Sequence, residues 1–185
     1  MKVVVASDHR GYEAKRRVLP LLKRLGHEFQ DLGCDGPAAV DYPDFAAPVA
    51  RAVANGKADV GILMDGSGIG MSIAANKFCG VRAALVHDEV TARRSREHNH
   101  CNVLCLGTDL LSEDQIRQIV EIFLSTNFVD GRHTKRIEKL KAIEDEQRQS
   151  HGGGGNVAGT ANANAAASSS SSVTAPAPAG RQSKA

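Results

Sequence analysis

The polar and apolar positions of the chain follow two alternating patterns. Short apolar runs rich in β-branched residues predict five strands, at 3–7, 28–32, 60–64, 82–86 and 103–106. Longer amphipathic segments between them predict helices at about 12–25, 45–55, 88–98 and 112–124, and a charged helix follows at about 134–149. Strands that alternate with helices of this length are typical of βα units in a parallel sheet. The pattern therefore predicts an α/β fold with a five-stranded parallel sheet and a C-terminal helix.

The amphipathic pattern ends near Gln149. From Ser150 the chain consists mainly of glycine, alanine, serine and asparagine, and it ends in SSSSSVTAPAPAGRQSKA. Such a segment buries too little apolar surface to offset the entropy of ordering it. We therefore expect one folded domain at 1–149 and a disordered low-complexity tail at 150–185.

The overall composition argues against several classes of partner. Lys and Arg total 23 against 21 for Asp and Glu, and this balance predicts binding neither to nucleic acid nor to a membrane surface. The N-terminal apolar run is too short for a signal-peptide core, and no stretch approaches the length of a membrane-spanning helix. Four cysteines without paired spacing predict reduced thiols in a cytoplasmic protein, with Cys101 and Cys105 in structural positions.

The ends of the predicted strands indicate where a ligand binds. In an open parallel sheet, ligands bind beyond the carboxyl ends of the strands, where the chain reverses its direction of winding. Polar and ionisable residues follow four of the strands, in the segments Ser7–Gly11, Asp65–Gly68, His87–Asp88 and Gly107–Thr108. We therefore expect a polar site at this edge of the sheet.

The segment LMDGSGIG after the third strand is the most informative of these. Its glycines offer backbone N–H groups ahead of the helix-like MSIAANK, and such a turn suits a phosphate or an oxyanion that develops in a reaction. The loop is not the GxGxxG fingerprint of dinucleotide-binding proteins, because its third glycine would fall on Met71. It also lacks the Lys-Ser/Thr ending of a P-loop, so a bound nucleotide is disfavoured. A tight turn that needs glycines for packing is the alternative.

Asp65 stands at the entrance of this glycine loop. A carboxylate beside oxyanion donors can remove a proton from the carbon next to a carbonyl while the donors hold the enediolate, as aldose-ketose isomerisation requires. Aspartate is already ionised at neutral pH, whereas a cysteine in that role needs a lowered pKa. The alternative is that Asp65 caps the following helix.

Arginine and histidine residues add to the candidate site. The four-residue spacing of Arg132 and Arg136 places them on one helix face, where two guanidinium groups can grip a phosphate, although a solvated charged surface is the alternative. His98 with Asn99, and His9 with Asp8, could supply acid, base and hydroxyl contacts. A metal could be bound by four histidines, but they lack helical HxxxH spacing, so we predict no metal and no other cofactor. These histidines are His9, His87, His98 and His100.

Taken together, six segments of the chain resemble a known family. The resemblance lies in ASDHRGYEAK, DYPDFA, GILMDGSGIGMSIAANK, VRAAL, SREHNHCNVLCLG and DGRHTKRIE, in this order. These segments are similar to the ribose-5-phosphate isomerase B and galactose-6-phosphate isomerase family, over essentially all of 1–149. The resemblance implies a three-layer, Rossmann-like α/β/α domain that forms a homodimer or tetramer, with each active site built from two subunits. It also implies metal-free interconversion of ribose 5-phosphate and ribulose 5-phosphate through an enediolate.

The same resemblance implies roles for individual residues. His98 opens the furanose ring with help from Asp8. The other site residues bind the phosphorylated sugar. Its hydroxyls are contacted by Asn99 and Tyr42, and its phosphate is bound by His9, Arg132 and Arg136. The enediolate is held by the loop residues Gly66, Ser67, Gly68, Ile69 and Gly70. The two arginines reach across the dimer.

Asp65 departs from the pattern of the family. Many members have a catalytic cysteine at this position, and another branch uses a glutamate at the position of Met71. We expect Asp65 to take the role of the base. One subunit type of the heteromeric galactose-6-phosphate isomerases carries aspartate at the matching place, so two alternatives stay open. They are an isomerase of another aldose phosphate, such as galactose or allose 6-phosphate, and a non-catalytic sugar-phosphate-binding subunit.

Overall fold

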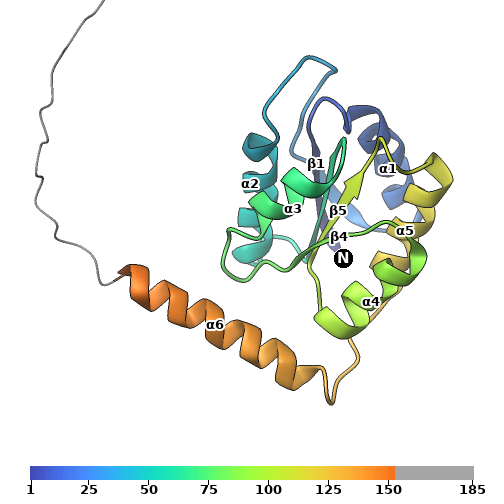
Figure 1. Cartoon of the computed structure of the whole chain (residues 1–185). Helices are drawn as coiled ribbons and strands as arrows, with labels where there is room; N and C mark the ends of the chain where they lie inside the picture. The colour runs from blue at the N-terminus through green and yellow to red at the C-terminus, as the bar shows by residue number, and fades with distance from the viewer. Residues whose placement is uncertain (153–185) are drawn as a thin grey trace, which may run out of the picture.

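A parallel sheet forms the centre of the protein (Figure 1). The computed structural model describes residues 1–152, and within this range the sheet consists of β1 (Lys2–Ser7), β2 (Glu28–Asp31), β3 (Val60–Asp65), β4 (Ala83–Leu85) and β5 (Val103–Gly107). All neighbouring strands are parallel, in the order β2-β1-β3-β5-β4. The chain winds outward from β1 to β2 and then continues on the other side of β1 with β3. The reversal therefore lies between the carboxyl ends of β1 and β3, where open sheets bind ligands.

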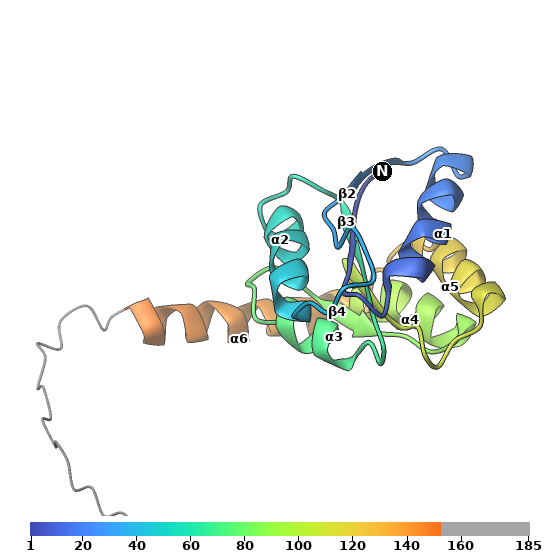
Figure 2. The ribbon, with the colours of Figure 1, turned by 90° about the horizontal axis from the view of Figure 1, so that it is seen from above.

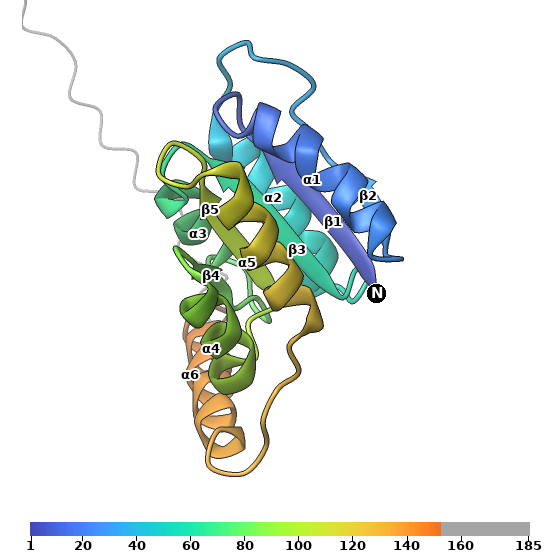
Figure 3. The same cartoon turned by 90° about the vertical axis from the view of Figure 1, so that its right-hand side faces the viewer.

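Helices cover both faces of the sheet (Figure 3). One face carries α2 (Tyr42–Ala54) and α3 (Ile69–Ala75), and the other carries α1 (Tyr12–Arg24), α4 (Glu89–Asn99) and α5 (Glu113–Ser125). The last helix, α6 (Thr134–Gly152), lies outside these layers and extends away from the body (Figure 2). Across residues 1–152, no helix combines the length and the apolar character needed to cross a bilayer. The predicted three-layer, Rossmann-like α/β/α fold is confirmed.

An apolar core fills the space on each side of the sheet. All six residues of β3 are buried, because helices cover both of its faces. Ile62 belongs to the core beside α1 and α5, together with Leu22 and Phe123. The next residue, Leu63, faces the core beside α2 and α3, as expected because successive side chains of a strand point to opposite faces. The central strands are thereby fixed, and the residues at their ends are held in a defined place.

The predicted strands and helices are present, with small differences at their boundaries. The second helix begins at Tyr42, earlier than the predicted Phe45, because Pro43 occupies its first turn, where a missing N–H costs nothing. Ser112 caps α5 as predicted, since its hydroxyl accepts a hydrogen bond from the backbone of Gln115. The last helix continues to Gly152, past the predicted boundary at Gln149, and the rest of the predicted tail lies outside the described residues.

The prediction that Arg132 and Arg136 share one helix face is wrong for Arg132. Gly131 has a φ of 89°, a left-handed conformation that the helix does not include. The helix starts after His133, whose carbonyl accepts a hydrogen bond from Ile137 N. Arg132 therefore lies in the turn that precedes α6, whereas Arg136 lies in the first turn of the helix.

Candidate active site

The glycine loop after β3 folds around the carboxylate of Asp65. Its Oδ1 accepts hydrogen bonds from the backbone N–H groups of Ser67, at 3.0 Å, and of Gly68. Its Oδ2 accepts a third from Met71, at 3.3 Å. Gly68 adopts a φ of 78°, a left-handed conformation that would strain any residue with a side chain. Glycine at this position therefore allows the three N–H groups to converge on the carboxylate. Asp65 is only 5% exposed. The loop therefore stabilises a negative charge, and the capping role considered for Asp65 is present.

The other loop residues complete a tight turn. Ser67 Oγ accepts a hydrogen bond from Ile69 N at 3.2 Å, and the side chain of Ile69 is 52% exposed. Gly66 lies under an ion pair of Arg10 and Asp109, whose charged atoms are 2.6 Å apart, and a Cβ at Gly66 would lie 2.7 Å from the aspartate. A side chain at this position would therefore displace the ion pair.

The ends of β1 and β5 lie beside the glycine loop. Asp8 Oδ1 accepts hydrogen bonds from the backbone of Arg10, at 2.8 Å, and of Gly11, at 3.0 Å. Thr108 Oγ1 donates to the backbone carbonyl of Asp65 at 3.1 Å. The backbone N–H of Asp8 donates to the carbonyl of Met64 at 3.1 Å, so the ends of β1, β3 and β5 are joined around the point where the sheet reverses its winding.

Two rings, of Tyr42 and His9, belong to the segments that follow β2 and β1. Tyr42 packs so closely on Gly70 that a Cβ there would lie 2.8 Å from the ring. His9 Nδ1 accepts a hydrogen bond from Val40 N at 3.3 Å, so the neutral ring carries its proton on Nε2. We call the set Asp8, His9, Tyr42 and 65–70 the loop half-site.

A second cluster lies at the C-terminal end of α4. The rings of His98 and His133 stack, with their centroids 4.4 Å apart and their planes 6° from parallel. Arg132 Nε donates to His133 Nε2 at 3.4 Å. Arg132 and Arg136 are exposed, and both lie near His133. We call the set His98, Asn99, Arg132, His133 and Arg136 the helix half-site, and its charge suits a phosphate.

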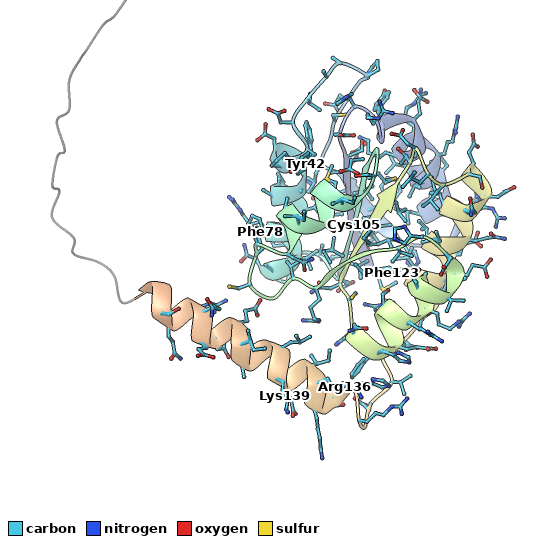
Figure 4. All side chains as sticks on the ribbon, viewed as in Figure 1. Tyr42, Phe78, Cys105, Phe123, Arg136 and Lys139 are labelled. Atoms are coloured by element: carbon cyan, nitrogen blue, oxygen red, sulfur yellow. The ribbon has the colours of Figure 1, made fainter. Side chains whose placement is uncertain are left out.

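The two half-sites lie at opposite ends of the sheet. Asp65 pairs with Gly107, the last residue of β5, whereas Asn99 ends α4 shortly before Val103, the first residue of β5. At roughly 3.3 Å per residue, the length of β5 alone separates them by about 13 Å. Figure 4 agrees, since Tyr42 and Arg136 lie at opposite sides of the body. Within residues 1–152, a single chain therefore does not bring the predicted site residues together.

The comparisons with known proteins decide the family. The family described as ribose/galactose isomerase matches residues 3–140. The chain belongs to the ribose/galactose isomerase family. Ribose-5-phosphate isomerase B of Escherichia coli (strain K12) is 39% identical over 146 residues, which cover 79% of this chain and 98% of that protein. The sugar-phosphate isomerase predicted from the sequence is confirmed at the level of the family.

Solved structures share the fold of this chain. Ribose-5-phosphate isomerase B of Clostridium thermocellum has a TM-score of 0.78 at 45% identity, and the match covers 80% of this chain and 99% of the other. Ribose-5-phosphate isomerase B of Mycoplasma genitalium, solved with bound ribulose-5-phosphate, has a TM-score of 0.75 at 43% identity, and that match covers 78% and 97%.

Two of the four cysteines, Cys101 and Cys105, are buried thiols that are poor proton acceptors at neutral pH. Burial raises the pKa of the Cys101 thiol to about 11. The Cys105 pKa is raised further by burial, with a contribution from the negative charge of Asp65. Cys34 is buried, with its Sγ 3.9 Å from Ser7 Oγ, and Cys79 is exposed. Thiols with such raised pKa values stay protonated at neutral pH.

The histidines form no metal centre in the part of the chain that the structure describes. In residues 1–152, no three His, Cys, Asp or Glu side chains are grouped so that they could hold a metal ion. His98 instead stacks on His133, and His100 stacks on Phe128 with centroids 4.8 Å apart.

The free energy of unfolding is expected to fall as the pH is lowered from 7.5 to 5.5. Burial lowers the pKa of His27, His100 and His133, and nearby positive charges contribute. The unfolded chain therefore binds more protons below the ordinary histidine pKa of about 6.5, which destabilises the folded state. Thermal unfolding at the two pH values should show a Tm a few degrees lower at pH 5.5. His133→Phe should show a smaller decrease, and an equal decrease in both proteins would contradict this origin.

Proposed function

We propose that the protein interconverts ribose 5-phosphate and ribulose 5-phosphate through an enediolate. Relatives named ribose-5-phosphate isomerase B match nearly their whole length to this chain. The observation that carries the proposal is the loop half-site, where the N–H groups of Ser67, Gly68 and Met71 converge on one negative charge. An enediolate oxygen is a charge of this kind.

The proposed reaction first opens the sugar ring and then moves a proton from C2 to C1. His98 first takes the proton of the C1 hydroxyl and, with help from Asp8, passes a proton to the ring oxygen, so that the furanose opens to the aldehyde. Asp65 then removes the C2 proton, and the electron pair moves onto the C1 carbonyl oxygen to form the enediolate. The C2 hydroxyl then gives its proton to the oxygen on C1, and Asp65 returns its proton to C1, which forms the ketose with its carbonyl at C2. Tyr42 and Asn99 contact the sugar hydroxyls.

The hydrogen bonds of Asp65 fit this step. Before proton transfer, the negative charge lies on the carboxylate, where three backbone N–H groups stabilise it. After proton transfer, Asp65 is neutral and the enediolate carries the charge, so the same donors can turn to the new oxyanion. A loop that stabilises the charge in both positions lowers the barrier between them.

We further propose that two subunits share each active site. The loop half-site of one subunit then faces the helix half-site of the other, which brings together groups that one chain holds about 13 Å apart along β5. The extended helix α6 offers a surface for this contact, since Leu140 is 46% and Ile143 is 58% exposed. A groove of about 850 Å³ lies between α6 and the edge strand β4. A homodimer, or a tetramer of such dimers, fits these observations.

The capping hydrogen bonds of Asp65 also favour one rival function, a non-catalytic sugar-phosphate-binding subunit. Initial rates on five-carbon and six-carbon aldose phosphates separate the possibilities. We expect the highest kcat/KM with ribose 5-phosphate. A preference for a six-carbon aldose phosphate would change the substrate, and binding without turnover on any of them would support the rival.

Arg136→Ala should raise the KM for ribose 5-phosphate by about tenfold, the usual effect of losing one charge-assisted hydrogen bond. Arg136 is exposed in the helix half-site, so its removal leaves the fold unchanged. Ribose without phosphate provides the control, and its kcat/KM should change little. Equal losses on both substrates would place Arg136 outside the phosphate site.

A further inference from the structure

His133 is a buried histidine that stability alone does not explain. It is 4% exposed, and its Nδ1 is the one buried side-chain nitrogen or oxygen among the described residues that has no hydrogen-bond partner. A buried polar atom without a partner destabilises a fold, whereas a phenylalanine ring would fill much the same space without that cost. The sequence patterns did not identify this residue, because it lies between two arginines in the charged run GRHTKR.

The contacts of His133 join two groups of the proposed site. One face of its ring stacks on His98 at 4.4 Å, and its Nε2 accepts the Nε–H of Arg132. Because Nε2 is an acceptor, the proton of the neutral ring lies on Nδ1. With its Nε engaged, Arg132 can present its two terminal nitrogens together, which is the geometry that binds a phosphate in bidentate fashion.

Other contacts already hold the segment that carries His133 against α4. Val129 N donates to the carbonyl of Glu97 at 3.1 Å, and Arg96 Nε donates to the carbonyl of Thr126 at 3.3 Å. Phe128 adds a ring stack with His100. The segment therefore has its own anchors.

We propose that His133 is a positioning residue for the isomerase reaction: it fixes the ring of His98 by stacking and orients the guanidinium of Arg132 through Nε2. The inference rests on the proposed function, in which His98 opens the sugar ring and Arg132 binds the phosphate. His133 thereby sets the distance between the phosphate and the anomeric hydroxyl to be deprotonated.

Only a neutral His133 can perform this role, because a protonated Nε2 would point an N–H at the N–H of Arg132. Burial lowers the pKa of His133, and so do His98, Arg132 and Arg136, while Glu97 raises it. These are the charged groups that face the ring from α4, from the preceding turn and from α6. The neutral form is favoured at neutral pH.

Two substitutions of His133 separate its two contacts. His133→Phe keeps a ring for stacking but removes the acceptor for Arg132, so KM for ribose 5-phosphate should rise about tenfold while kcat changes less than about threefold. His133→Gln keeps an acceptor near Nε2 but removes the ring, so kcat should fall about tenfold with a smaller change in KM. His133→Phe should leave Tm unchanged or raise it.

Phe128→Leu is the matched control, because it loosens the same segment without touching His98 or Arg132. It should lower Tm and leave kcat and KM close to those of the wild type. The proposal is overturned if both His133 variants keep wild-type kcat and KM, or if they lower Tm as Phe128→Leu does without the KM and kcat split. A wild type that isomerises no aldose phosphate overturns the proposed function itself, and the role of His133 with it, so the two failures are distinguishable.

Discussion

Asp65→Asn should lower kcat by roughly two to four orders of magnitude while the affinity for ribose 5-phosphate changes little. The amide removes the proton acceptor, but its Oδ1 can still accept the hydrogen bonds from Ser67 and Gly68. The amide nitrogen would face the N–H of Met71, so the loop loses one of its three bonds. Steady-state rates give kcat, and calorimetric titration with the sugar phosphate gives the affinity.

Asp65→Cys is the control for this experiment, since it restores the thiol that many family members carry. We expect this variant to retain part of the activity and to lose it on alkylation. The wild type should resist alkylation at this position. Cys79 is exposed and will react in both proteins, so mass spectrometry must locate the modified residue. Near-normal turnover of Asp65→Asn would show that Asp65 only caps the loop.

Mixing two inactive variants should restore activity, because each damages a different half-site. His98→Asn damages the helix half-site, whereas Asp65→Asn damages the loop half-site. In a mixed dimer one of the two sites contains both lesions and the other contains neither. Random pairing makes half of the dimers mixed, and one of the two sites in each mixed dimer is intact. Activity should therefore reach about a quarter of the wild-type value, whereas each variant alone is lower by orders of magnitude.

The matched control combines two lesions in the same half-site. Co-expression of Asp65→Asn with Asp8→Asn should give no recovery, because every site in the mixed dimer keeps one damaged loop half-site. When both pairs are purified through two different tags, only mixed dimers are assayed, and the Asp65→Asn and His98→Asn pair should then reach about half of the wild-type activity. If the Asp65→Asn and His98→Asn pair shows no more activity than the two single variants added together, a shared site would be contradicted.

Much of the fold follows from the sequence. The β-branched runs around Val5 and Ile62 are buried on both faces, and such runs predict central parallel strands. The boundaries were less predictable where local chemistry decides them. Pro43 begins α2 earlier than the apolar spacing indicates, and the left-handed Gly131 delays α6 beyond Arg132.

The site was predictable as a set of residues but only partly as an arrangement. A helix that follows a parallel strand runs back toward the amino end of the sheet, so the position of His98 away from Asp65 already follows from the βα order. The hydrogen bonds of Asp65 depend on the φ angle of Gly68, which the loop sequence allows but does not specify. His133 was missed because a charged run does not indicate which of its members is buried.

The most direct test of the central claim follows ribose 5-phosphate in deuterium oxide by proton NMR with the full chain present. An isomerase that forms an enediolate should convert the aldose to an equilibrium mixture with ribulose 5-phosphate. Deuterium should enter C1 of the ketose and, by the reverse reaction, C2 of the aldose. An unchanged aldose spectrum after hours at micromolar protein, with the C2 proton signal intact, would contradict the account.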